Sequence, residues 1–213
     1  MARDRGAPIV VELLPEPARG PVTEEGPLRS IQEAELTMSA ELLGELWTVE
    51  SLERLGRAYW RHLTRSSLGL IRVTYSPTWR SLVLVSRRLE LLRFGAPRYE
   101  TEPGLGRISW RIERGLLVAP AGRGRGEFRF EVRRPPPDPG NEGARIRISA
   151  VVENYYPLLR GHGRFARLGT QLYSQTQLRI HRRVARSFLR SLERGELPEL
   201  RPERAPSYER PLP

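Results

Sequence analysis

The sequence predicts an α+β fold, in which a curved antiparallel sheet of about six to seven strands wraps around a long C-terminal helix. Two short helices are expected after the first strand. Apolar residues recur at helical spacing in two stretches, near residues 39–64 and 163–194, and alternate with polar residues between them. A helix that follows a run of antiparallel strands has to bury its apolar stripe against the face of that sheet.

The first strand and the two short helices occupy residues 30–64. Residues 30–38 alternate between two faces, as a short strand does. Ser39 then stands at a helix N-cap position and opens a helix through Trp47. Thr48 is a second N-cap, and the helix after it runs to about Thr64. Its apolar stripe consists of Leu52, Leu55, Tyr59 and Leu63.

From Leu68 onward the pattern becomes that of strands. Short apolar runs at residues 70–75, 82–85, 89–94 and 99–101 are separated by Pro77, by two arginines at 87–88 and by the stretch from Gly95 to Pro97. Proline and glycine at these positions favour turns. We therefore predict four short strands here.

The clearest strands are residues 107–113, 127–133 and 145–156. Their even positions are mostly apolar, and their odd positions are mostly Arg, Glu or Ser. This alternation indicates an antiparallel sheet with one face in water, where cross-strand Arg/Glu pairs stabilise by a few tenths of a kcal/mol to about 1 kcal/mol each. The glycine-rich stretch 121–126 lies between two such strands with no helix after it, which favours a hairpin turn over a phosphate-binding loop.

The C-terminal helix is predicted from about Gly163 to Arg194. This stretch contains no proline, and its apolar residues recur mostly at spacings of three and four. They are Phe165, Leu168, Leu172, Tyr173, Ile180, Val184, Phe188 and Leu192.

The proline distribution divides the chain into three parts. Residues 1–28 are predicted to be a mostly disordered tail in which only Ile9–Leu14 could add an edge strand, and residues 195–213 a second disordered tail rich in proline and charge. The single folded domain is then 29–194.

Composition excludes several kinds of chemistry. The chain lacks cysteine, which excludes disulfides, thiolate metal sites and a cysteine nucleophile. All 36 basic residues are arginine, which excludes a Schiff-base lysine and a Walker-type phosphate loop. The arginines are spread along the chain, and the densest cluster, residues 179–190, has only Phe188 interleaved among its arginines. We interpret the net charge of +11 as a composition bias that argues against a nucleic-acid partner.

The sequence also lacks targeting and membrane signals. The apolar run after Met1 breaks at Glu12 and Pro15, too early for a secretory signal. Nowhere do ~18 apolar residues run together, so no transmembrane segment is expected. We expect a soluble cytoplasmic protein, either a monomer or a homodimer.

This order of elements resembles the START-like or SRPBCC superfamily, whose helix-grip fold wraps a curved sheet around the last helix. The resemblance covers about Ser30 to Arg194 and rests on element order and on the one-sided alternation between Ile108 and Val152. It implies a deep cavity between sheet and helix that accepts an apolar or amphipathic small molecule or lipid. Because the superfamily has no short diagnostic motif, the resemblance carries over no catalytic residue.

The even positions of the strands and one arc of the helix are the candidates for lining such a cavity, with a filled core as the alternative. Tyr156, at the end of the last strand, either borders the cavity mouth or fastens the loop. The candidate residues are Trp110, Phe128, Phe130, Ile148, Tyr156, Tyr173, Gln177 and His181.

No catalytic or metal-binding constellation stands out. The three histidines are scattered with no carboxylate at a ligand spacing, so we predict no metal, no cofactor and no catalytic residue. His181 is the histidine best placed for acid–base work, although its arginine neighbours favour a surface position and disfavour its protonated form. The sequence thus favours non-catalytic binding or carrying of a hydrophobic ligand. The alternatives are a polyketide cyclase- or aromatase-like enzyme, and a basic surface that docks an acidic partner or an anionic membrane.

Overall fold

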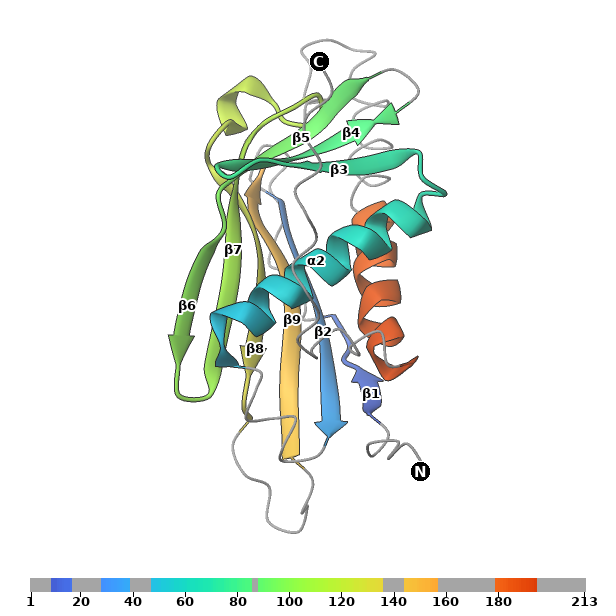
Figure 1. The fold of residues 1–213 in the computed structure, drawn as a ribbon, viewed down its shortest axis with the longest axis vertical. Coiled ribbons are helices and arrows are strands. Elements are labelled where there is room, and N and C mark those ends of the chain that lie inside the picture. Colours follow the sequence, from blue (N-terminus) through green and yellow to red (C-terminus); the bar gives the residue numbers. More distant parts are fainter. Residues whose placement is uncertain are drawn as a thin grey trace.

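The structure is a computed structural model that describes residues 9–16, 28–38, 47–85, 88–135, 144–156 and 179–194. These residues form a nine-stranded antiparallel sheet with helices on one of its faces (Figure 1). The elements are β1 (Val10–Leu13), β2 (Leu28–Met38), α2 (Val49–Ser66), β3 (Ile71–Tyr75), β4 (Trp79–Leu84), β5 (Leu89–Gly95), β6 (Arg98–Glu102), β7 (Leu105–Arg114), β8 (Gly126–Arg133), β9 (Ala144–Tyr155), a helical segment at 179–191, and two 3-10 turns (Pro120–Gly122 and Leu192–Arg194).

The strand order is β1-β2-β9-β8-β7-β5-β4-β3, with β6 beside β7. The early strand β2 therefore pairs with the last strand, β9, over most of its length. The predicted count of six to seven strands was too low. One reason is β1, which lies in the predicted N-terminal tail and pairs with β2 from Val10↔Thr37 to Leu13↔Ala34. The predicted stretch Ile9–Leu14 is thus an edge strand.

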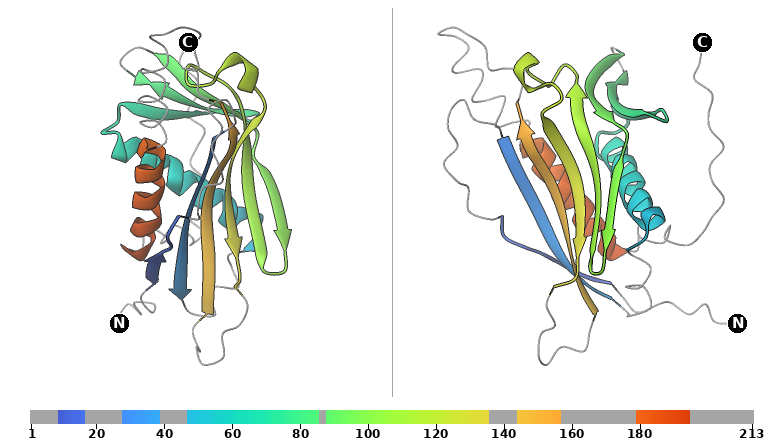
Figure 2. Two further views of the ribbon diagram at one scale, coloured as in Figure 1. Left: turned by 180° about the vertical axis from the view of Figure 1, so that it is seen from behind. Right: turned by 90° about the vertical axis from the view of Figure 1, so that its left-hand side faces the viewer.

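The other reason is a break in the strand that lies beside β7. Strand β5 pairs with the end of β7 at Phe94↔Ile112, and β6 pairs with its beginning from Arg98↔Ser109. Strands β5 and β6 thus lie one after the other along the same edge of β7. The break between them lies at residues 95–97, where Pro97 has no backbone N–H to donate to a neighbouring strand. Strands β3–β5 run at a steep angle to β6–β9 (Figures 1 and 2).

Helix α2 begins at the predicted N-cap, Thr48, whose Oγ1 accepts a hydrogen bond from the Ser51 amide at 3.2 Å. It has 18 residues and ends at Ser66, two residues beyond the predicted end near Thr64. Gly56 lets it approach the sheet closely, because a Cβ at this position would stand 2.9 Å from Cη2 of Trp110. The preceding predicted helix, 39–47, lies outside the described residues except for Trp47.

The helical segment 179–191 is the second half of the predicted C-terminal helix, and residues 163–178 lie outside the described part of the chain. It buries Ala185, Phe188 and Leu189 against the same face of the sheet that α2 covers. The two helices also contact each other, since His62 Nε2 lies 3.2 Å from Ser187 Oγ. Figure 2 shows both helices on one side of the sheet.

The opposite face of the sheet carries the Arg/Glu pairs that the alternation predicts. The Glu131 carboxylate accepts hydrogen bonds from three arginines, Arg107, Arg129 and Arg133. Burial alone would raise the pKa of Glu131, but the hydrogen bonds from Arg129 and Arg133 hold it below its ordinary value. Arg129 also bonds to Glu153 at 2.7 Å. This lattice neutralises many arginines within the protein itself.

Candidate ligand-binding site

The layer between the sheet and the two helices is built from aromatic rings. Trp110 on β7 and Phe128 on β8 are cross-strand partners and stack with ring centroids 5.6 Å apart. Tyr59 and Trp60 of α2 lie over them, at 5.1 Å and 5.5 Å from Phe128. Edge-to-face and offset packing at these separations adds about 0.5–1.5 kcal/mol per pair beyond the buried area. The layer is therefore a rigid aromatic platform.

Four of the predicted cavity residues lie together in this layer. Trp110, Phe128, Phe130 and Ile148 are all buried on the helix-covered face. In the described part of the chain they pack against each other and against the helices, as a filled core does. Phe130 contacts Phe188 of the C-terminal segment at 5.7 Å.

Of the other four predicted residues, two lie at the edges of this layer or away from it, and two lie outside the described residues. Tyr156 is half-buried and packs against Gly122, where a Cβ would stand 2.4 Å from Cβ of Tyr156. Its neighbour Tyr155 donates a hydrogen bond to the Leu117 carbonyl at 2.6 Å, which fastens the end of β9 to the loop after β7. Tyr173 and Gln177 lie outside the described residues.

His181, the eighth, lies at the margin of the aromatic layer. Its ring is edge-on to Phe128, with centroids 6.0 Å apart and an interplanar angle of 89°. The residue as a whole is half-buried, but its Nε2 atom is buried and has no hydrogen-bond partner among the described residues. Burial and the nearby charge of Arg182 lower the pKa of His181 to about 4. The imidazole is thus neutral at pH 7.

Three further buried polar atoms lie in the aromatic layer or in its cross-sheet row. Ser30 of β2 faces the helices in the same cross-sheet row as Phe128, since both strands pair with β9 at Val152. The Ser30 Oγ and the indole nitrogens of Trp60 and Trp110 are buried, and the described residues offer them no partner. Buried polar atoms are usually satisfied, and leaving one unpaired costs about 1–3 kcal/mol. These unpaired atoms belong to the aromatic layer or to its cross-sheet row.

Sequence reasoning missed a polar cluster beside this layer. Glu53 of α2 accepts hydrogen bonds from Tyr99 of β6 and from Arg80 of β4, the latter at 2.7 Å. Arg80 is 7% exposed, and its guanidinium lies 5.9 Å from the Trp110 ring. Arg57, one turn along α2, also bonds to Glu53 at 3.0 Å. Because Arg80, Tyr99 and Arg57 all bond to the Glu53 carboxylate, we assign them a structural role: they hold α2 over the break between β5 and β6.

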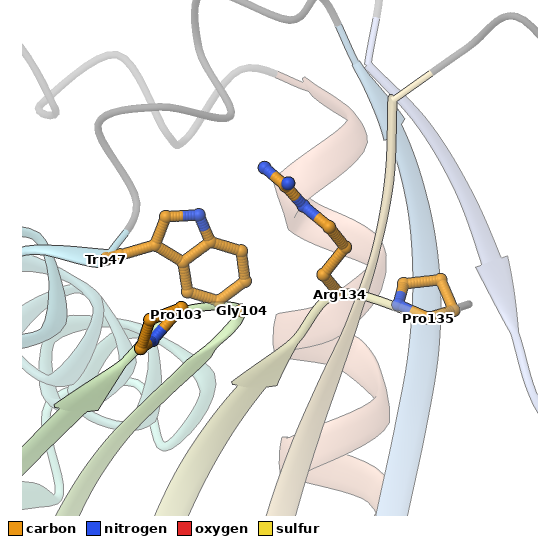
Figure 3. A pocket seen from close by; sticks show the side chains of 5 residues that line it. All are labelled: Trp47, Pro103, Gly104, Arg134 and Pro135. Carbon is orange, nitrogen blue, oxygen red and sulfur yellow. The ribbon is translucent and has the colours of Figure 1, made fainter. Parts of the chain in front are cut away.

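A hollow lies beside the start of β7 and the end of β8. It is a shallow depression of about 570 Å³ lined by Trp47, Pro103, Gly104, Arg134 and Pro135 (Figure 3). Arg134 and Pro135 follow β8, whose last residue is five positions beyond Phe128. The depression is therefore separate from the aromatic layer around His181.

The described residues contain no group of His, Asp or Glu side chains that could hold a metal ion. None of the helices in the described ranges is long and apolar enough to cross a membrane.

We compared the chain with known protein families, curated proteins and solved structures. No protein-family model and no curated protein matches the sequence. Among solved structures, the crystal structure of human STARD10 is similar, with 11% sequence identity and a TM-score of 0.31 over 93% of this chain and 76% of that chain.

Proposed function

We propose that the protein binds or carries a hydrophobic or amphipathic small molecule between the sheet and the C-terminal helix, without a chemical step. The proposed architecture is the helix-grip arrangement, in which the sheet curves around that helix. The observation that carries the proposal is the buried, neutral His181 Nε2 beside the ring of Phe128. An apolar wall with a few convergent polar atoms is the usual composition of a small-molecule site.

The chemistry of these groups indicates which class of ligand they would bind. The aromatic rings offer apolar surface, for which a hydrocarbon chain or ring system is the matching partner. A neutral imidazole nitrogen makes one hydrogen bond, as donor or acceptor according to its tautomer. A hydroxyl suits either tautomer because it both donates and accepts. The preferred ligand is then mostly apolar with one uncharged polar group.

The proposal is tested by titrating delipidated protein with a long-chain alcohol and with the hydrocarbon of the same length, following tryptophan emission. Wild type is expected to bind both and to bind the alcohol more tightly. The substitution His181→Leu is expected to weaken the alcohol about tenfold, the size of one hydrogen bond, and to leave the hydrocarbon unchanged.

The matched control is His62→Gln, because His62 contacts the C-terminal segment through Ser187 but does not border Phe128 in the described structure. This variant is expected to bind both probes as wild type does. If wild type takes up neither probe, the proposed function is wrong.

A further inference from the structure

One end of the sheet exposes an unusual set of apolar side chains. Leu68 and Leu70, in the turn between α2 and β3, are 91% and 56% exposed. Val85 at the end of β4, Leu89 at the start of β5 and Leu116 in the loop after β7 are also exposed. We call these five residues the apolar tips.

The tips lie on four segments that run side by side. The Val85 amide donates to the Leu70 carbonyl at 3.0 Å, Leu84 pairs with Leu89, and the Leu116 amide donates to the Glu90 carbonyl at 2.9 Å. In Figure 1 the α2–β3 turn and the β4–β5 turn lie at the same end of β3–β5. The tips therefore form one continuous apolar surface. A single exposed leucine is common on protein surfaces, but a continuous apolar patch indicates an interaction site.

Arginines surround this surface. Arg65 lies in the last turn of α2, Arg72 on β3 and Arg88 in the β4–β5 turn. Arg123 borders a shallow depression together with Leu89 and Leu116. The described part of the chain gives these four arginines no acidic partner. On the outer face of the sheet, by contrast, arginines such as Arg129 are neutralised by glutamates.

We propose that the apolar tips and these four arginines form a docking surface for an anionic lipid bilayer. Protruding apolar side chains enter the headgroup region, while the guanidinium groups stay at its level and pair with lipid phosphates or carboxylates. A bilayer fits this surface better than an acidic protein does, because the apolar side chains project from several separate segments, and the depression that Leu89 and Leu116 border is shallow. This inference goes beyond the proposed ligand binding and does not rest on it.

The test is co-sedimentation of the full chain with vesicles of phosphatidylcholine alone or mixed with phosphatidylserine. Wild type is expected to bind the mixed vesicles, and more weakly as salt is raised. The double substitution Leu68→Ser with Leu70→Ser is expected to lower the partition coefficient at least about tenfold. Each of Arg65→Gln, Arg72→Gln and Arg88→Gln is expected to lower it about fivefold.

The matched controls are Val10→Ser on β1 and Arg111→Gln on the outer face of β7, both exposed and both away from the tips. They are expected to leave the partition coefficient unchanged. All variants are at exposed sites, so an unchanged melting temperature verifies folding. The proposal is overturned if wild type ignores the mixed vesicles, if Arg111→Gln weakens binding as much as Arg88→Gln, or if the leucine variants bind as wild type, which would indicate charge attraction alone.

Discussion

Replacing Glu53 by alanine is expected to lower the free energy of unfolding by about 3–5 kcal/mol, the cost of leaving a buried charge without its partner. The charge is that of Arg80, which is 7% exposed and bonds to Glu53 at 2.7 Å. Tyr99 loses its acceptor in the same substitution. Denaturant unfolding of the two proteins measures the difference directly.

The stability of two further variants distinguishes the buried Glu53–Arg80 pair from an ordinary exposed ion pair. Glu53→Ala combined with Arg80→Leu is expected to recover part of the lost stability, since no unpaired charge remains. The control is Glu100→Ala, which removes an ion pair whose carboxylate side chain is 55% exposed and is expected to cost at most about 1 kcal/mol. A loss below about 1 kcal/mol for Glu53→Ala would show that α2 is held in place by apolar packing alone.

The stability of the protein is expected to fall as pH drops from about 6.5, because of His181. Its pKa is about 4 in the folded protein and 6.5 as an unperturbed group. As the pH falls below about 6.5, the unfolded state therefore binds a proton at His181 while the folded state does not. This proton binding lowers the free energy of unfolding. The loss reaches about 2 kcal/mol at pH 5 and about 3 kcal/mol at pH 4, and then levels off.

The substitution His181→Leu is expected to abolish this slope between pH 6.5 and 5, as measured by denaturant unfolding at each pH. Glu90, Glu131 and Glu153 have lowered pKa values, so the stability that they contribute is lost at lower pH, below about 4.5. The window above pH 5 thus separates the effect of His181 from that of these carboxylates, and the comparison with His181→Leu separates it from that of the other two histidines. An unchanged slope in the variant would mean that the imidazole is solvated in the folded protein.

Local patterns were sufficient to predict the central strands. The alternation at residues 107–113 and 127–133 corresponds to β7 (Leu105–Arg114) and β8 (Gly126–Arg133) within two residues. Thr48 was likewise predicted as an N-cap from its residue type and the residues just after it, because capping depends on a few neighbouring residues. The alternation of apolar and polar residues and the N-cap depend only on residues close together in the sequence. They can therefore be recognised before the fold is known.

The polar groups of the site depend on long-range contacts. Glu53 meets Arg80 and Tyr99 only because α2 crosses the break between β5 and β6, and no spacing in the sequence encodes that crossing. His181 was named among the candidate cavity residues, but its arginine neighbours favoured a surface position. Its burial beside Phe128 follows from how the C-terminal segment packs on β8.

Native mass spectrometry of the freshly purified protein, followed by organic extraction, tests the central claim most directly. We predict a discrete added mass that disappears on denaturation and is recovered as a mostly apolar compound with one uncharged polar group. The variant with Leu68→Ser and Leu70→Ser should retain this mass, since the apolar tips are separate from the aromatic layer. A bare protein mass, unchanged after incubation with a lipid extract, would contradict ligand binding between sheet and helix.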